Sequence, residues 1–361
     1  MDFLIDRWTE LEKRFGSPVM SPEWFRAGAA TLCPPYDLKL AVREKDGALD
    51  GVAPIGRLKH FMSRLEVLGT TLLTEEGGFL YSNTDALMEM VEAIIQLDKP
   101  VFLRRVRMYS EEAKIWEKEI CARGLRCLVR EERLPWVAVR SDWKSFEKQQ
   151  ISSSRRSIFR RLQRLAEQKG EFKFEAVVPT FENLDQYLDE AFEVEVSNWK
   201  ARRRTAMKYN ERLGGFFREY ARLATESGEL RLFFLRVNEE PIAVELTTLH
   251  GNRIWILKIG HNEAWWRCSP GILLMHNVIR FCFENGLEGC EFGGTDEPWL
   301  HIWANESHSA WTYRIYPGSV KGMFQLGVDL LQLTGGKIHT VAATLKARKN
   351  SHNETGQAQN N

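Results

Sequence analysis

Three strand-like segments follow one another closely in the second half of the chain, and they constrain the fold more than any other feature. They cover residues 230–237, 242–250 and 253–260, with turns at 238–241 and 251–252. Short turns between runs of β-branched and aromatic residues predict an antiparallel meander. A nearly all-apolar helix over 272–284 and a short strand over 289–293 come next. A helix that is apolar on almost every side should be buried, so this order predicts a mixed α/β layer around that helix.

The first 150 residues also alternate between strand-like and helix-like segments. Strands are predicted at 38–42, 51–55 and 100–103, and helices at 84–97, capped by Thr84, and at 111–123, ended by Gly124. The Asp46-Gly47 turn favours a hairpin between the first two strands. This alternation predicts an α/β unit. We therefore expect an N-terminal domain at 1–150, a C-terminal domain at 151–317, peripheral helices at 318–347 and a disordered tail at 348–361.

The composition argues against several classes of protein. The chain has 361 residues, a formal net charge of +1 and six cysteines, none of which form a C-x-x-C pair. Neither a zinc site nor a disulfide framework is therefore indicated. No apolar run approaches the roughly 18 residues of a membrane-spanning helix, and residues 1–7 are acidic where a signal peptide would be basic. We expect a cytoplasmic protein with no metal site and no membrane span.

Four short motifs occur in order within residues 151–316. They are Arg155-Arg156-Ser157-Ile158-Phe159-Arg160-Arg161-Leu162, Glu240-Pro241-Ile242-Ala243, Ser269-Pro270-Gly271-Ile272-Leu273-Leu274, and Phe292-Gly293-Gly294-Thr295-Asp296-Glu297-Pro298-Trp299. In this order they resemble the CelD-like acetyltransferase family, a branch of the GNAT superfamily that is itself similar to the Fem-type aminoacyltransferases. The segments Pro22-Glu23-Trp24-Phe25 and Gly51-Val52-Ala53-Pro54-Ile55 resemble the N-terminal half of that family.

The resemblance implies a mixed α/β, tandem GNAT-like acyl-CoA N-acyltransferase fold, with two mixed-sheet units side by side. Acetyl-CoA or another acyl-CoA would be the donor. The acceptor would be an amine of a sugar, an amino acid or a cell-surface polysaccharide precursor, bound as a small molecule, glycan or peptide. A homodimer is among the expected assemblies.

The start of the buried helix is the candidate donor site. Ser269 fits the N-cap position, Pro270 the first helical position and Gly271 the second. A glycine there lets an anion approach backbone N–H groups, and the helix dipole adds partial positive charge. Arg267 lies just upstream and could clamp a phosphate. The superfamily usually has a more glycine-rich turn, but the resemblance assigns Arg267, Ser269, Gly271 and Ile272 to the cofactor.

Acyl transfer also needs a base for the amine and a proton source for the departing thiolate. The candidate catalytic residues are Glu245, Asp296 and His301, with Glu297 and Trp299 at the substrate. Glu245 either points into the cleft, where burial would raise its pKa, or lies on a solvated outer face. Relatives commonly carry Tyr-Lys where this chain has Trp299-Leu300, so His301 is the candidate substitute for the tyrosine.

Two alternatives remain open beside the acyl-CoA-dependent enzyme. A Fem-like transferase would use aminoacyl-tRNA, and a helical hairpin over 181–226 with Arg202-Arg203-Arg204 at its tip favours it mildly. A non-catalytic GNAT-like binding or scaffold protein of polysaccharide synthesis fits the missing Tyr-Lys. The helix predicted over 151–169, capped by Ser153 or Ser154, has an apolar face opposite Arg156, Arg160, Arg161 and Arg164. Since no aromatic residues interleave with these arginines, we expect no specific nucleic-acid binding.

Overall fold

The computed structural model describes residues 2–33, 36–45, 47–58, 64–196 and 210–333. The first elements are α1 (Asp2–Glu12), α2 (Pro22–Thr31), β1 (Tyr36–Lys45), β2 (Ala48–Leu58), β3 (Leu65–Val67), α3 (Thr70–Leu73), β4 (Leu80–Tyr81), α4 (Thr84–Gln96), β5 (Val101–Arg107), α5 (Glu111–Ala122) and β6 (Arg126–Ala138). The remaining ones are α6 (Trp143–Gln150), α7 (Ser153–Glu167), β7 (Phe172–Val177), α8 (Leu184–Val196), α9 (Glu211–Glu226), β8 (Leu230–Val237), β9 (Glu240–His250), β10 (Arg253–His261), α10 (Pro270–Glu284), β11 (Gly289–Glu291) and β12 (Glu306–Tyr316).

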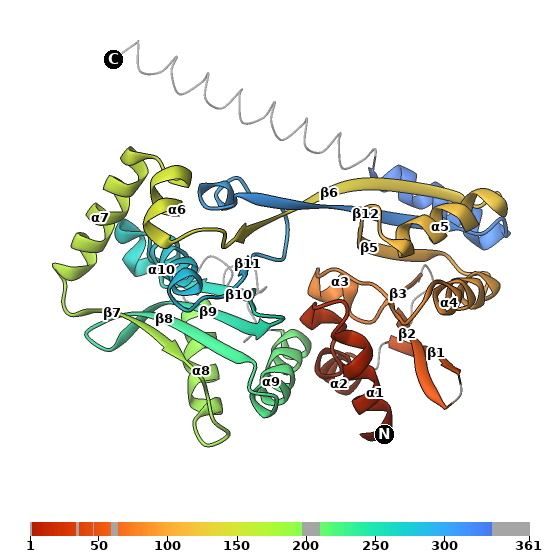
Figure 1. Ribbon diagram of the computed structural model, residues 1–361, viewed down its shortest axis with the longest axis horizontal. Helices are drawn as coiled ribbons and strands as arrows, with labels where there is room; N and C mark the ends of the chain where they lie inside the picture. The colour runs from red at the N-terminus through yellow and green to blue at the C-terminus, as the bar shows by residue number, and fades with distance from the viewer. Residues whose placement is uncertain (1, 34–35, 46, 59–63, 197–209, 334–361) are drawn as a thin grey trace, which may run out of the picture.

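The strands of the described chain form one long mixed sheet (Figure 1). Their order is β1-β2-β3-β5-β12-β6-β11-β10-β9-β8-β7, and β4 pairs with β2 off this path. The long strands β6 and β12 pair antiparallel from Glu306↔Trp136 to Tyr316↔Arg126. Because β6 also pairs with β11 and β12 also pairs with β5, this pair joins the two halves of the sheet. The expected α/β fold of two mixed-sheet units side by side is confirmed.

The predicted hairpins are present, but two predicted helix caps were wrong. The β1–β2 hairpin runs from Tyr36↔Leu58 to Lys45↔Ala48. Helix α4 is capped by Asn83, whose side chain accepts the Ala86 N–H at 2.9 Å, and not by Thr84. Helix α7 is capped by Ser152, not by Ser153 or Ser154. The cap is the residue before the first helical one and its side chain reaches three residues ahead, so each prediction lay one or two residues too late.

The predicted meander of β8, β9 and β10 is confirmed, and β10 carries an irregularity that matters below. Antiparallel pairing runs from Leu230↔Thr248 along β8 and β9, and from Arg253↔His250 along β9 and β10. The β10 register shifts between Ile256 and Lys258. Such a bulge leaves one residue out of the ladder and bends the strand.

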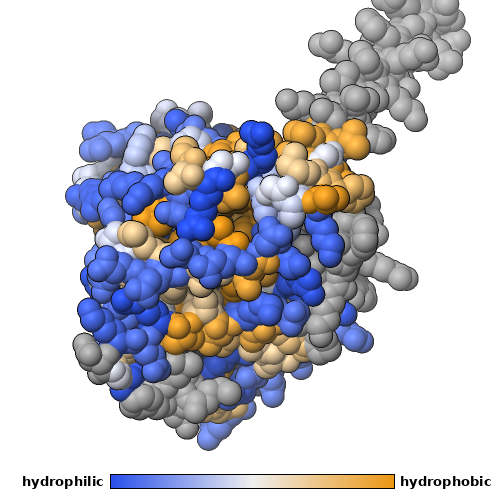
Figure 2. Space-filling model, turned by 90° about the vertical axis from the view of Figure 1, so that its right-hand side faces the viewer, coloured by the Kyte–Doolittle hydropathy of each residue, from blue (hydrophilic) through white to orange (hydrophobic). Residues whose placement is uncertain are grey.

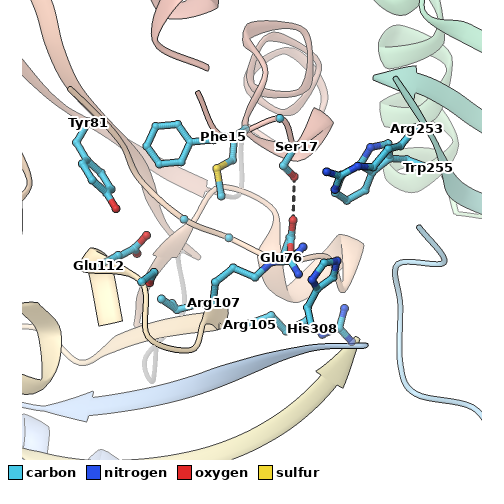
Figure 3. A pocket seen from close by; sticks show the side chains of 16 residues that line it. Phe15, Ser17, Glu76, Tyr81, Arg105, Arg107, Glu112, Arg253, Trp255 and His308 are labelled. Atoms are coloured by element: carbon cyan, nitrogen blue, oxygen red, sulfur yellow. Dashed lines mark hydrogen bonds and ion pairs between the residues drawn. The ribbon is translucent and has the colours of Figure 1, made fainter. Parts of the chain in front are cut away.

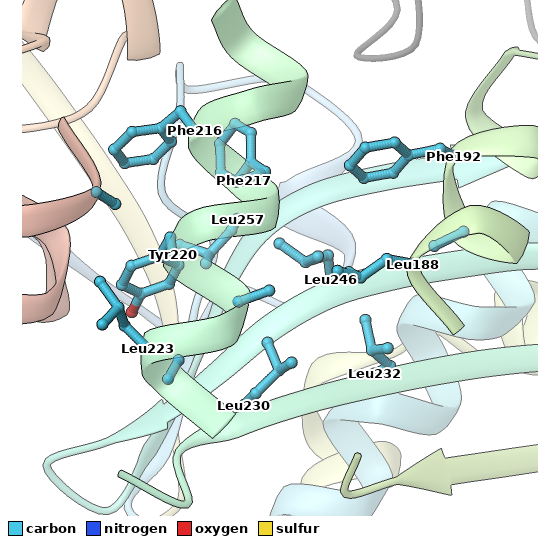
Figure 4. Close-up of a cluster of buried hydrophobic side chains, with 14 of the residues drawn as sticks. Leu188, Phe192, Phe216, Phe217, Tyr220, Leu223, Leu230, Leu232, Leu246 and Leu257 are labelled. Atoms are coloured by element: carbon cyan, nitrogen blue, oxygen red, sulfur yellow. The ribbon is translucent and has the colours of Figure 1, made fainter. Parts of the chain in front are cut away.

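One hydrophobic cluster fixes the two units against each other. It combines α8, α9 and one face of the meander (Figure 4) with side chains from α2 and the segment after β3. Trp24 of α2 packs edge-on against Phe216 and Tyr220 of α9, with ring centroids 4.7 and 4.9 Å apart. Aromatic contacts of this kind add to the burial of large apolar surfaces. The relative position of the units is thus set by core packing.

Helix α10 covers the opposite face of the meander, as its composition predicts. Leu274, Val278 and Ile279 are fully buried there, in a cluster that also takes up Phe159 and Leu162 of α7. Ile158, expected on the apolar face of α7, is instead 41% exposed. That face is therefore narrower than the periodicity suggested.

Residues 320–333 form a helix at the periphery. Its exposed apolar residues are Val320, Met323, Phe324, Leu330, Leu331 and Leu333, and Figure 2 shows hydrophobic side chains gathered near the point where the described chain ends. The predicted tail at 348–361 and the hairpin tip at Arg202-Arg203-Arg204 lie outside the described residues. Among the described helices none is long and apolar enough to cross a membrane. The same part of the chain has no cluster of potential metal ligands, and its six cysteines form no disulfide.

Candidate functional site

The site begins where two parallel strands separate. Strands β10 and β11 pair at three positions only, from Arg253↔Gly289 to Trp255↔Glu291. Beyond them β10 continues to His261, whereas β11 ends at Glu291. The bulge near Leu257 lies at the point of divergence. Beyond Trp255, β10 therefore diverges from β11.

A cavity of about 610 Å³ lies at the start of α10, and we call it the donor cavity. Its walls come from β9, β10, the first turn of α10 and the loop after β11, and include Glu245, His261, Gly271 and Trp299. A volume of this size falls within the range of small-molecule sites. A Cβ added at Gly271 would lie 3.5 Å from His261 Nδ1, an ordinary contact, so the cavity would accept a larger side chain there without a backbone clash.

The first turn of α10 matches the sequence prediction, with Ser269 at the N-cap and Pro270 as the first helical residue. The Ser269 carbonyl accepts the N–H groups of Ile272 and Leu273 at 3.0 and 3.2 Å. Ser269 itself is left-handed, with φ 46°, and its side chain makes no capping hydrogen bond. A left-handed non-glycine residue costs energy and is often found at functional sites. Ser269, Gly271 and Ile272 all line the donor cavity.

Arg267 lies outside that cavity. Its side chain is exposed and its guanidinium lies 5.6 Å from the centre of the Trp266 ring. Trp266 is 67% exposed and does line the donor cavity. The pair therefore forms an exposed cation–π contact next to the start of α10.

Glu245 is buried beneath α10. It lies on β9 opposite Ile259 of β10, is 1% exposed, and lines the donor cavity. Its Oε2 atom has no hydrogen-bond partner among the described residues. Burial raises the pKa of Glu245 to about 8, because a low-dielectric site disfavours the ionised carboxyl. Of the two sequence-based alternatives, the solvated outer face is thus excluded.

A second cavity of about 210 Å³, the acceptor-side cavity, lies between β10 and the loop after β11. It shares Ile259, Met275, Glu297 and Trp299 with the donor cavity. Gly293 and Gly294 of that loop have φ of 60° and 56°, a region that glycine enters without steric cost. The loop is thereby folded close to β10: a Cβ on Gly293 would lie 3.2 Å from the Ile256 carbonyl oxygen.

The N-terminal unit supplies a carboxylate to this second cavity, which the sequence analysis missed. Glu75 and Thr74 line it together with Lys258. Burial raises the pKa of Glu75, against the opposing effects of Lys258, Arg105 and a hydrogen bond from the Gly294 backbone. No local motif predicts that Glu75 or His261 lines a cavity, because each is placed there by contacts between distant segments.

Asp296 and His301 are brought together by the loop that walls both cavities. Asp296 Oδ1 and His301 Nε2 are 2.7 Å apart, with side chains 30% and 56% exposed. Neither residue lines either cavity, whereas Glu297 and Trp299 line both.

One of the arginines of helix α7, Arg156, forms hydrogen bonds within the fold. Arg156 Nη1 donates to the carbonyl oxygens of Glu147, Lys148 and Ile151, at the end of α6. Arg160, Arg161 and Arg164 are exposed. Arg156 is therefore engaged with the fold, and only the other three form an open basic surface.

Residues 153–300 match the family model of the acetyltransferase (GNAT) domain. This part of the chain is similar to that domain family. It contains the meander, the α10 start and the diverging strands described above. No curated protein sequence matches the chain.

Two solved structures show the same fold over nearly the whole chain. One is the C-terminal domain of a candidate lysylphosphatidylglycerol synthetase from Agrobacterium fabrum, at 13% identity and TM-score 0.56, covering 91% of this chain and 95% of that one. The other is FemX, at 12% identity and TM-score 0.55, covering 85% of this chain and 93% of that one. The similarity therefore extends through both units and supports the expected fold.

Proposed function

We propose that the protein is an acyl-CoA-dependent N-acyltransferase that transfers an acyl group, in the simplest case acetyl, to an amine. The observation that carries the proposal is the donor cavity, which connects the start of α10 with the diverging strands and contains the buried Glu245. The GNAT superfamily consists generally of acyltransferases, and the match over 153–300 supports the same class of reaction here.

The residues at the start of α10 fit a CoA pyrophosphate. Backbone N–H groups in a first helical turn have no intrahelical acceptor, and the helix dipole favours an anion there. Gly271 presents no side chain, while Ser269 and Ile272 flank it in the cavity wall. Arg267, exposed beside Trp266, would reach phosphates outside the cavity.

The diverging strands fit the reacting atoms. The β10 backbone at the Leu257 bulge would offer an N–H to the thioester carbonyl oxygen. The amine nitrogen would form a bond with the carbonyl carbon and the C–S bond would break. A base would take the proton that the amine loses, and the CoA thiolate would need a proton on departure.

Glu245 is the proposed base, because its pKa of about 8 is suited to proton transfer near neutral pH. His261 in the donor cavity is the proposed proton source for the thiolate, because His301, paired with Asp296, lies outside both cavities. His261 would take the place of the tyrosine that Trp299 replaces. The acceptor amine would enter between Glu297, Trp299 and the Gly293-Gly294 turn, with Asp296 orienting it from the loop.

A thermal-shift screen against CoA, acetyl-CoA and longer acyl-CoAs tests this proposal. A ligand that binds only the folded state stabilises it by about 2.7 kcal/mol at a concentration of 100 times Kd. We expect a clear rise in Tm with acetyl-CoA. A protein that no CoA compound stabilises would instead fit an aminoacyl-tRNA-dependent transferase or a non-catalytic binding protein of polysaccharide synthesis, and the first of these would bind charged tRNA.

A further inference from the structure

A third cavity, of about 300 Å³, lies at the junction of the two units, and we call it the junction cavity. Figure 3 shows its lining. Phe15 and Ser17 come from the N-terminal segment, Arg105 and Arg107 from β5, and Glu112 from α5. Arg253 and Trp255 of β10 and His308 of β12 close the opposite side.

The junction cavity shares walls with the candidate active site. A narrow gap of about 20 Å³ shares Glu76, Arg105, Arg107 and Trp255 with the junction cavity. The same gap shares Glu75, Ile256, Leu257 and Gly293 with the acceptor-side cavity. Neighbouring walls therefore lead from the diverging strands, past Glu75, to the arginines of β5.

Arg105 is held in an unusual position to face this region. It is 2% exposed and has φ 58°, next to a register shift between β5 and β12. Its Nε atom lies 3.1 Å from Glu132 Oε2 and its Nη1 donates to the Thr74 carbonyl at 3.1 Å. Nη2 is buried and has no partner among the described residues. A bulge changes the direction of a side chain at a cost in backbone energy. Burying a guanidinium nitrogen without an acceptor adds a further free-energy cost.

Arg107, two residues further along β5, adds a second donor of the same kind. Its Nη2 lies 3.4 Å from Glu76 Oε2, and Glu76 also accepts the Ser17 hydroxyl at 2.8 Å. The Nη1 atom of Arg107 is buried and unpartnered within the described chain. Both guanidinium groups thus line one polar cavity, and each keeps one buried nitrogen without a partner in the described chain.

Two of the carboxyls around this cavity are ion-paired, and a third is buried without a cationic partner in the described chain. Glu76 is engaged by Arg107 and Ser17, and Glu291 is engaged by Arg253 and His308 at 3.1 Å each. Glu112 is 6% exposed, accepts the Phe79 N–H at 3.2 Å and has a free Oε1. Burial raises the pKa of Glu112 to about 8, so near neutral pH its carboxyl is mainly uncharged and can donate a hydrogen bond.

We propose that the junction cavity binds an oxyanion, a carboxylate or a phosphate, carried by the acyl acceptor at some distance from its amine. Guanidinium groups recognise both anions through charge-assisted hydrogen bonds. The cavity's link to an acceptor rests on the proposed N-acyltransferase function; its ability to bind an oxyanion does not. The acceptor is accordingly an extended anionic amine that contacts both units of the chain.

Acetate and methyl phosphate test the cavity directly, because the methyl group of each can be followed by saturation-transfer NMR on the full chain. Methylammonium is the cationic control. We expect wild type to bind at least one of the two anions, and the stronger of them identifies the group recognised. Arg107→Gln should weaken this binding roughly tenfold, the effect of losing one hydrogen bond between charged groups. Arg104→Gln is the matched control, since Arg104 precedes Arg105 on β5 but does not line the cavity.

Two further measurements separate this inference from the proposed function. Gly271→Glu should leave anion binding unchanged if the anion does not occupy the start of α10, and Arg107→Gln should leave acetyl-CoA affinity unchanged. Acetyl-CoA binding without any anion binding would overturn the junction site alone. Anion binding that Arg107→Gln does not weaken, or that methylammonium matches, would overturn it as well.

Discussion

Replacing Glu245 by glutamine should make the protein more stable than wild type, by a margin that grows as the pH rises. In wild type, folding raises the pKa of this carboxyl from the ordinary value of 4.5 to about 8. The folded state therefore holds a proton that the unfolded state has lost. The stability associated with that proton is fully present below about pH 4.5 and declines as the pH rises through about 8. Glutamine keeps the shape of the protonated carboxyl and cannot ionise.

The size of this stability difference follows from the two pKa values of Glu245, 4.5 in the unfolded chain and about 8 in the folded protein. One pKa unit corresponds to about 1.36 kcal/mol. Between about pH 5 and pH 8, the free energy of unfolding of wild type should fall by on the order of 3 kcal/mol relative to Glu245→Gln. Relaxation of the cavity and entry of water can only reduce this difference, so it is an upper estimate.

Urea denaturation of both proteins at a series of pH values measures this difference. Thr247→Val is the matched control, because Thr247 is fully buried two residues further along β9 and donates its hydroxyl to the Arg231 carbonyl at 3.0 Å. Its loss should cost about 1 kcal/mol at every pH. If the wild-type and Glu245→Gln curves stay parallel from acid to alkaline pH, the buried and proton-holding state of Glu245 is refuted.

Three other substitutions test separate parts of the account. Gly271→Glu should weaken acetyl-CoA binding by roughly tenfold or more in isothermal titration, because a carboxylate would oppose a phosphate at the helix start; a folded variant with wild-type affinity would exclude the α10 site. Asp296→Asn should lower turnover, measured as CoA release with an amine acceptor, more than it lowers CoA affinity, and equal losses would argue against a role at the acceptor. Arg156→Ala should cost on the order of 1–3 kcal/mol in urea denaturation because three carbonyl oxygens lose their donor, whereas Arg160→Ala, on the exposed face of the same helix, should cost little.

Local pattern was enough to predict the parts of the fold that depend on neighbouring residues. The meander of β8 to β10 and the buried α10 follow from short turns and from an apolar helix, and both are confirmed. The true caps, Asn83 and Ser152, were not predicted, because several polar residues near each helix start are suitable for the N-cap position. The left-handed Ser269 was not predicted either, since serine has no strong preference for that conformation.

The candidate site depends largely on contacts that no local pattern contains. Glu245 lies among apolar neighbours on a strand, and only the packing of α10 decides which face of β9 is covered. Glu75 enters the acceptor-side cavity from the other unit, more than a hundred residues away along the chain from Lys258. Arg105 is aimed by a bulge whose partner is β12. Each of these features is set by tertiary structure.

Hydrogen–deuterium exchange in the presence of saturating acetyl-CoA tests the central claim most directly. If the donor lies between the start of α10 and the part of β10 that diverges from β11, amides in 271–275 and 257–261 should exchange more slowly when it binds, while those of α7 should not change. Unchanged exchange in both segments, with protection appearing elsewhere in the chain, would show that the donor cavity is not where acetyl-CoA binds.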